Sequence, residues 1–470
     1  METSSAGRGA SQTRKPGLVG RLGLHRPELR AWAMYDWAAS AVQTTIMVAV
    51  FPIYFIRVAG ANVDEPVANQ HLATANAISV GIVALLSPVL GAIADYSARK
   101  KQLLAVFLIV GVLSTAGMFF IGEGDLRLAE ILYVLSMSSV AGTYVFYESL
   151  LPHIASESEM DRVSTAGYAI GYTGGGVLLA LNLAWIQKPE WFGLPSGPGL
   201  TPDEATLPAR LAFLSVAVWW LLFSIPLFRG VREPARLLEP DETPRGSVVR
   251  HAFVRLGETF HELRGYRHAF LMLLAFLFYN DGISTIQKMA AAYATELGIA
   301  QNAIITAILI VQFLGIPFSF MFGMLAGRIG AKRAIFLGLI VYTGISILGY
   351  RMTTAAHFYA LAALVGMVQG GTQALSRSLF ANMIPRHKSG EFFGFFSVFN
   401  KFAGIFGPLL FASVIGTTGS SRHGILSVIA FFALGGMLLS FVNVGIGERA
   451  ARQAEERVRE DRGPRTEEVA

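Results

Sequence analysis

The sequence GAIADYSARKK at residues 91–101 indicates the overall architecture, because a second version of it, GMLAGRIGAKR, occurs at residues 323–333. Each version begins near the end of an apolar run and finishes in a cluster of Lys and Arg. The acid of the first version, Asp95, is replaced by Gly327 in the second. Two copies of one loop, 232 residues apart, predict a chain built from two related halves.

Composition indicates that lipid is the main solvent of these halves. Hydrophobic residues make up 53% of the 470 residues, charged residues make up 15%, and the mean hydropathy is +0.50. The net charge of +6 sits in loops and tails between apolar runs, so it indicates orientation in a membrane rather than nucleic-acid binding. The chain has no Cys, which excludes disulfides, thiolate metal sites and cysteine nucleophiles.

Twelve segments are apolar enough to cross a hydrocarbon core of roughly 30 Å. They are residues 30–57, 71–95, 102–122, 128–151, 163–187, 208–228, 267–294, 299–327, 333–350, 352–384, 390–416 and 423–446. We therefore predict an all-α membrane protein with 12 transmembrane helices in two pseudo-symmetric six-helix bundles. The expected divisions are an amino tail at 1–29, bundles at 30–228 and 267–446, a linker at 229–266 and a carboxyl tail at 447–470.

The distribution of Lys and Arg predicts the orientation of the chain. One set of loops and tails carries 29 of these residues, and the opposite loops carry 4. The positive-inside rule therefore places both termini and the linker in the cytoplasm. The expected location is the inner membrane of a bacterial cell.

Two further pairs of segments repeat between the halves. Tyr35 and Tyr279 are each followed by a Gln eight residues later. A Gly-Thr pair precedes Glu148 in the fourth segment and Arg377 in the tenth, with the same spacing. The two halves thus carry opposite charges at equivalent positions.

The loop at residues 91–101 resembles the signature between the second and third helices of major facilitator transporters, with Gly91, Asp95 and Arg99 at the matching positions. Five further blocks resemble the autophagy-related vacuolar amino-acid effluxer family and its bacterial relatives. They are YDWA at 35–38, GY at 171–172 with GGG at 174–176, YNDG at 279–282, LSRSLF at 375–380 and EFFG at 391–394. Ala39 and Glu148 stand where that family has Asn, which leaves a different cargo open.

Charged residues inside spans are costly, so they usually face a cavity or one another. Glu148 and Arg377 lie shortly before prolines that follow in their segments, which places both in the cytoplasmic third of the membrane. We expect them to form a gate; a static salt bridge and a substrate site are the alternatives. Asp95 and Arg99 are expected to latch neighbouring helices in one conformation. For these two, the alternative is a basic loop that only fixes topology.

The resemblance implies that the first, fourth, seventh and tenth helices line a central cavity. A few polar groups in an apolar cavity suit a small amphipathic solute. Hydrogen bonding between helices is the alternative role for each of them. The candidates for substrate binding or coupling are Asp36, Gln43, Tyr144, Asn280, Asp281, Gln287, Gln369 and Gln373.

The expected function is secondary active transport of a small solute by alternating access. Export of amino acids or similar metabolites is what the resemblance implies. Protons are the expected coupling ion, with Asp281 the first candidate for the titrating group and Asp36 the second. A transporter-like receptor and a lipid or drug translocator are the alternatives that share every feature. No motif supports an enzyme or a cofactor, and we expect a monomer with lipid around it.

Overall fold

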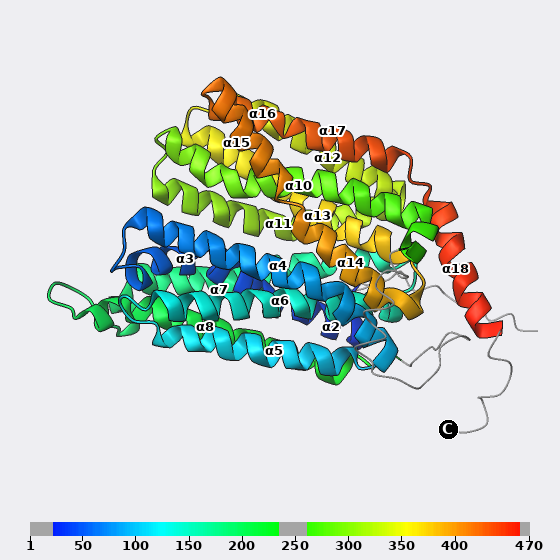
Figure 1. Ribbon diagram of the computed structural model, residues 1–470, viewed down its shortest axis with the longest axis horizontal. Helices are drawn as coiled ribbons and strands as arrows, with labels where there is room; N and C mark the ends of the chain where they lie inside the picture. The colour runs from blue at the N-terminus through cyan, green and yellow to red at the C-terminus, as the bar shows by residue number, and fades with distance from the viewer. Residues whose placement is uncertain (1–21, 235–260, 461–470) are drawn as a thin grey trace, which may run out of the picture.

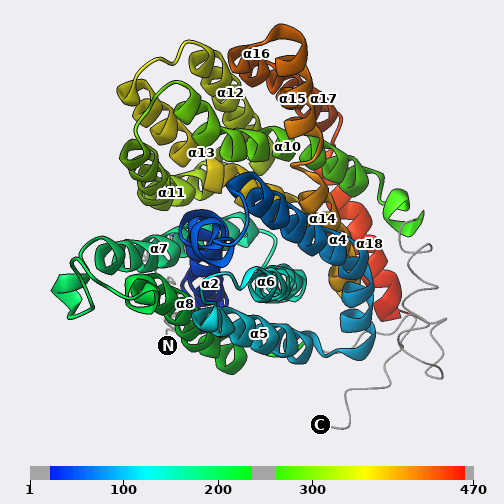
Figure 2. The same ribbon diagram turned by 60° about the vertical axis from the view of Figure 1, so that its left-hand side comes forward.

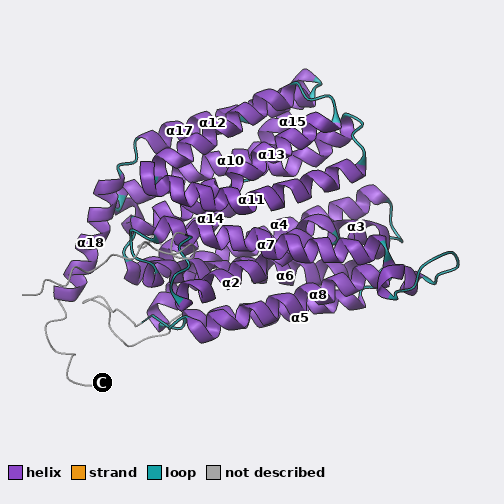
Figure 3. Cartoon of the chain, turned by 180° about the vertical axis from the view of Figure 1, so that it is seen from behind, coloured by secondary structure: helices purple, strands orange, loops and turns teal. Residues whose placement is uncertain are grey.

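The computed structural model describes residues 22–234 and 261–460, and within those ranges every regular element is a helix (Figure 3). The predicted amino tail, most of the linker and the end of the carboxyl tail lie outside the described residues.

The helices form two bundles that lie side by side (Figure 1, Figure 2). The first bundle consists of α2 (Pro27–Ala41) continued by η1 (Val42–Ala49), α3 (Phe51–Tyr54) and η2 (Phe55–Ala59), then α4 (Glu65–Ser97), α5 (Lys100–Gly117) with η3 (Met118–Phe120), α6 (Leu126–Ile154), α7 (Met160–Gln187) and α8 (Pro202–Gly230). The second consists of α10 (Arg267–Glu296), α11 (Gln301–Ile329), α12 (Ala331–Tyr350), α13 (Ala355–Asn382), α14 (Ser389–Phe402) with α15 (Phe406–Thr418), and α16 (Ser421–Ser427) with α17 (Ile429–Ser440).

These segments make six spans in each bundle and confirm the predicted fold class. Among the described residues, 11 segments are long and apolar enough to cross a membrane. The remaining predicted span is α13, which carries Gln369, Gln373 and Arg377.

The two copies of the repeated loop each have a residue of positive φ at the same position. The eighth residue of the first copy, Ala98, has φ +49°, and the eighth residue of the second, Gly330, has φ +86°. Ala98, with ψ +42°, is left-handed, whereas Gly330, with ψ +148°, lies in a region that is essentially open to Gly alone. Each ends the preceding helix just before the basic cluster. The left-handed conformation costs Ala about 1–2 kcal/mol.

The bundles touch mainly at one end of the molecule, which we call the basic end because the loops rich in Lys and Arg lie there. Helix α14 packs against α4 and α6, and α7 packs against α11 and α13 (Figure 2). The closest approach is made by glycines, since Gly91 lies against the backbone of Gly390, and Gly394 lies against that of Ser87. At the opposite end, η2, α3 and α15 pack chiefly within their own bundles.

Two predicted elements differ from the structure. The eleventh span was expected to be continuous over residues 390–416, but it is interrupted between Phe402 and Phe406, where Gly404 has φ +106°. The carboxyl tail was expected to begin at residue 447 and no helix was predicted in it, but Val444–Glu460 forms helix α18. This helix crosses the basic end (Figure 1), where Arg452 pairs with Glu157 of the first bundle.

Candidate functional site

Arg377 crosses from the second bundle into the first. It belongs to α13, its side chain is 1% exposed, and its Nε donates a hydrogen bond of 3.0 Å to Oγ of Ser164 on α7. Its Nη2 donates a second bond of 3.0 Å to the Ser164 carbonyl. The guanidinium carbon lies 5.0 Å from the ring centre of Trp32 and 4.8 Å from that of Tyr168. Hydrogen bonds and aromatic faces thus fix the plane of the guanidinium.

Two carboxylates share this guanidinium. Asp36 of α2 has an oxygen 3.7 Å from Nη2 of Arg377, and Glu148 of α6 has an oxygen 3.8 Å from Nη1. Both acids are buried, being 4% and 7% exposed. One cation therefore faces two acids in a region from which water is largely excluded, so the three side chains carry one uncompensated negative charge when both acids are ionised. We call Asp36, Glu148 and Arg377 the charge triad.

Asp36 has more hydrogen-bond partners than Glu148 in this triad. Tyr147 donates its hydroxyl to one Asp36 oxygen at 2.7 Å, and the Tyr144 hydroxyl lies 3.5 Å from the other. Within the described ranges Glu148 has Arg377 as its ion-pair partner and no hydrogen bond from a tyrosine hydroxyl. The sequence predicted a pair of opposite charges; the structure adds Asp36 to it and brings Tyr144 to the same place.

The predicted latch at the basic end is built around Asp95. This carboxylate pairs with Nζ of Lys100 at 2.8 Å and accepts a hydrogen bond of 2.8 Å from the backbone N–H of Glu391 in the other bundle. Lys100 also donates to Oγ of Ser389 at 2.7 Å. Arg99 was the predicted basic partner, but its side chain is exposed, and Lys100 is the residue that points into the contact.

Asp281 does not face the charge triad; it lies against the interruption between α14 and α15. Its Oδ1 accepts hydrogen bonds from the N–H groups of Gly404 at 2.6 Å and Gly407 at 3.0 Å, which lie at the start of α15. Its Oδ2 is buried and has no hydrogen-bond partner within the described part of the chain. Two turns further along α10, Lys288 donates to the Gly404 carbonyl at 3.0 Å. The acid thus meets the positive end of α15, and the ammonium meets the negative end of α14.

Asn280 and Gln373 join a chain of side-chain amides. Nε2 of Gln373 donates to Oδ1 of Asn280 at 3.4 Å, and Nδ2 of Asn280 donates to Oδ1 of Asn400 at 2.8 Å. Asn280 is 1% exposed, whereas Asn400 is exposed. The chain connects α13, α10 and α14 and ends at a solvent-accessible amide.

The other predicted polar residues are more open. Gln43 on η1 and Gln287 on α10 have exposed side chains, and Gln369 on α13 is half-buried. The sequence did not single out Trp32, Tyr147 and Ser164, which hold the charge triad. No local pattern marks them, because each contributes only through a contact with a distant helix.

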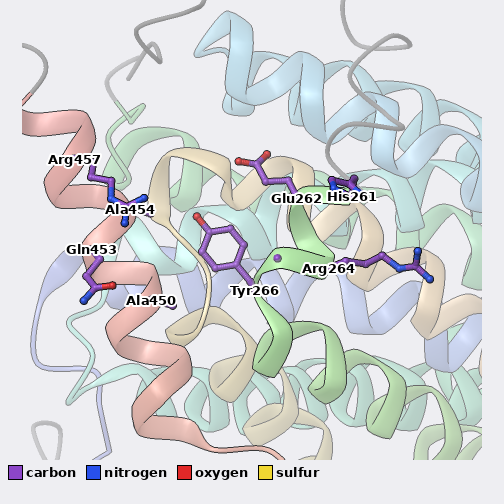
Figure 4. Close-up of a pocket in the computed structure, with 9 residues that line it drawn as sticks. His261, Glu262, Arg264, Tyr266, Ala450, Gln453, Ala454 and Arg457 are labelled. Atoms are coloured by element: carbon purple, nitrogen blue, oxygen red, sulfur yellow. The ribbon is translucent and has the colours of Figure 1, made fainter.

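A cavity of about 580 Å³ lies at the basic end, away from these intramembrane charges (Figure 4). It is formed between residues 261–266 and helix α18. The residues that line it are His261, Glu262, Arg264, Gly265, Tyr266, Ala450, Gln453, Ala454 and Arg457. Five of them belong to the linker predicted at 229–266 and four to the carboxyl tail predicted at 447–470, so neither predicted bundle lines this cavity.

Comparison with known proteins places the chain in a family. Residues 67–454 match the family described as vacuole effluxer Atg22 like. The MFS-type transporter YxiO of Bacillus subtilis is 36% identical over 413 residues, which cover 88% of this chain and 94% of that protein. Autophagy-related protein 22 of Yarrowia lipolytica is 27% identical over 323 residues, covering 63% of this chain and 52% of that protein.

Solved structures with the same fold include two sugar transporters. The proton:xylose symporter XylE, at 13% identity, has a TM-score of 0.63 over 90% of this chain and 96% of its own. FucP in the outward conformation, at 12% identity, has a TM-score of 0.64 over 90% of this chain and 99% of its own. The fold, the family match and the YxiO relationship agree with one another. The chain is an integral membrane protein that belongs to the Atg22-like family of major facilitator transporters.

Proposed function

We propose that this protein exports small solutes, amino acids or similar metabolites, by alternating access, and that the proton gradient drives it. The observation that carries the proposal is the charge triad. Arg377 is contributed by one bundle, and Asp36 and Glu148 are contributed by the other. Buried polar contacts between two rigid bundles can be made in one conformation and broken in the next, which is what a gate requires.

The distribution of contacts indicates which end of the molecule this gate closes. The bundles meet at the basic end, where the charge triad is reinforced by the Asp95 and Lys100 contacts to residues 389–391. With the basic end in the cytoplasm, as the positive-inside rule predicts, the structure is closed toward the cytoplasm and faces outward. The expected inner-membrane location is supported by the bacterial relative YxiO.

Asp281 is the first candidate for the proton-binding group and Asp36 the second. One oxygen of Asp281 accepts two backbone hydrogen bonds, while the other is buried without a partner. An ionised oxygen in that position is costly, and a proton removes the cost. Asp36, in contrast, has two tyrosine hydroxyls and Arg377 around it.

The description of the family as effluxers supports export, and amides near the accessible face support a small polar or amphipathic solute. Untargeted metabolite comparison of cells with and without the protein identifies solutes to assay. Export of those solutes is then measured in proteoliposomes with and without an imposed pH gradient.

Wild-type protein should accumulate solute only when the gradient is present. Asp281→Asn should lose gradient-driven accumulation while still exchanging solute for solute, because neutralising the residue removes the coupling and leaves the binding site. The control is Asp203→Asn, whose acid is 83% exposed at the far end of the molecule. Wild-type flux that ignores the gradient, or full accumulation by Asp281→Asn, would refute coupling through this residue. A failure to move any solute would favour a receptor.

A further inference from the structure

His153 lies in the contact that closes the basic end. It is the second-last residue of α6 in the first bundle, it is half-buried, and its Nε2 lies 3.1 Å from Oγ of Ser389 in the second bundle. The same nitrogen lies 3.2 Å from Nζ of Lys100. One imidazole nitrogen thus touches both the opposite bundle and the ammonium that pairs with Asp95.

The contact with Lys100 assigns the protonation state of this nitrogen. An ammonium carries only donors, so Nε2 of His153 is the acceptor in the contact and cannot hold a proton of its own. The ammonium is itself held in place, since it pairs with Asp95 at 2.8 Å and donates to Oγ of Ser389 at 2.7 Å. The closed basic end therefore requires a neutral His153.

The other groups that act on the imidazole are basic. Arg386 and His387 of η5 (Arg386–Lys388) interact with it electrostatically from the second bundle. Asp95, the acid that bonds into this cluster, is paired with Lys100. A proton on Nε2 of His153 would place an N–H against the ammonium 3.2 Å away, with these basic side chains nearby.

Protonation of His153 and closure of the basic end thus oppose each other. When the bundles part, the imidazole meets cytoplasmic water, in which its ordinary pKa is about 6.5. The open form then binds a proton that the closed form rejects. Closure is therefore unopposed above about pH 6.5 and weakens as the cytoplasmic pH falls below that value.

We propose that His153 is a cytoplasmic pH sensor that shifts the protein from the outward-facing toward the inward-facing state when its Nε2 takes up a proton. The sensor goes beyond the proposed function, because it needs only that the bundles part at the basic end. It involves neither the solute nor the proton that drives transport. The carrier opens to the cytoplasm more often when the cell interior is acidic.

The test measures opening without a solute. Ser87 is buried between the bundles and the chain has no native Cys, so Ser87→Cys in inside-out membrane vesicles reacts with a membrane-impermeant maleimide only when the basic end opens. Ser158→Cys, exposed in the loop between α6 and α7, corrects for the effect of pH on the thiol. From about pH 7.5 to about pH 5.5 the corrected rate should rise about tenfold, as expected for one group with a pKa near 6.5.

Three variants, each combined with Ser87→Cys, separate His153 from other titrating groups. His153→Gln keeps an acceptor for Lys100 but takes no charge, so its labelling rate should rise no more than about twofold over the same range. His153→Arg is always charged and should label at neutral pH as fast as the wild type does in acid. The control His357→Gln, an exposed histidine at the opposite end, should respond as the wild type does.

Lys100→Met keeps the proposal testable if the His153 variants do not fold. It removes the cation that rejects the proton, so acid should no longer speed labelling, whatever the rate at neutral pH. The proposal is overturned if wild-type labelling does not rise in acid, or if His153→Gln or Lys100→Met rises as much as the wild type. Neither solute flux nor a proton gradient enters these measurements, so a pH-insensitive opening would refute the sensor and leave proton-coupled export standing.

Discussion

At Arg377 the shape of the side chain matters as much as its charge. The guanidinium donates two hydrogen bonds to Ser164 while its remaining nitrogen faces Glu148. Its flat faces lie near the Trp32 and Tyr168 rings. A lysine ammonium could not meet these partners together, since its donors radiate from one point.

We expect Glu148→Gln and Arg377→Gln each to lower transport about 100-fold or more. Arg377→Gln leaves two buried acids without a cation, at a cost of about 3–5 kcal/mol, and Glu148→Gln removes an acid that Arg377 contacts across the two bundles. Arg377→Lys should also be impaired, though less. The double variant Glu148→Arg, Arg377→Glu should recover part of the loss because it restores one cation and two acids. Initial rates of solute flux in proteoliposomes measure these effects. Normal transport by both single variants would mean that the triad has no part in the cycle.

Residues that carry charge could be predicted from the sequence, whereas those that hold them could not. Asp36, Glu148 and Arg377 are conspicuous in apolar segments, and the internal repeat pairs the last two. Ser164 is an ordinary helix residue until α13 is placed against α7. Lys100 was missed for a different reason, since it adjoins Arg99 and only the turn at Ala98 decides which of the two points toward Asp95.

The interruption between α14 and α15 depends on partners far away in the sequence. Side chains of α10 bond the free backbone groups on either side of it. Asp281 accepts from N–H groups at the start of α15, and Lys288 donates to the Gly404 carbonyl after the end of α14. The segment carries Gly404 and Pro408, and Pro408 has no N–H to bond the Gly404 carbonyl, but its neighbours are mostly apolar and a continuous helix was predicted from them. Helix α18 was missed because its low hydropathy suggested a tail, although its apolar positions recur with helical spacing.

Gly404 should be intolerant of a side chain. Its φ of +106° is unfavourable for any L-residue, and an added Cβ would lie 2.8 Å from Nζ of Lys288. We expect Gly404→Ala to destabilise the protein by about 1–2 kcal/mol or more and to slow transport.

Gly416 on α15 is the matched control, because nothing lies within 4 Å of an added Cβ. Gly416→Ala should raise stability by about 0.5–1 kcal/mol. Thermal unfolding in detergent compares the two, and an equal or higher unfolding temperature for Gly404→Ala would contradict this role of the break.

For the whole molecule, the repeat predicted two bundles, and their contacts determine which end is closed. The sequence cannot reveal this conformation, because inward-facing and outward-facing states share every residue and differ only in which contacts are made. The glycines at 91, 390 and 394 permit the close contact at the basic end, but no pattern indicates when it forms.

We predict that the bundles separate at the basic end during each transport cycle. Ser87 of α4 and Ser397 of α14 face each other between the bundles, in the half of each membrane span nearer the basic end, with their hydroxyl oxygens 3.4 Å apart. The chain has no native Cys, so a Ser87→Cys, Ser397→Cys variant offers a single cross-link between the bundles, within reach of disulfide geometry.

Solute flux through this variant should stop on oxidation and return when the disulfide is reduced. The two single-cysteine variants should transport equally well under both conditions. If the oxidised double variant, shown by mass spectrometry to be fully cross-linked, transports as fast as the reduced protein, the bundles do not part at this end and the account is wrong.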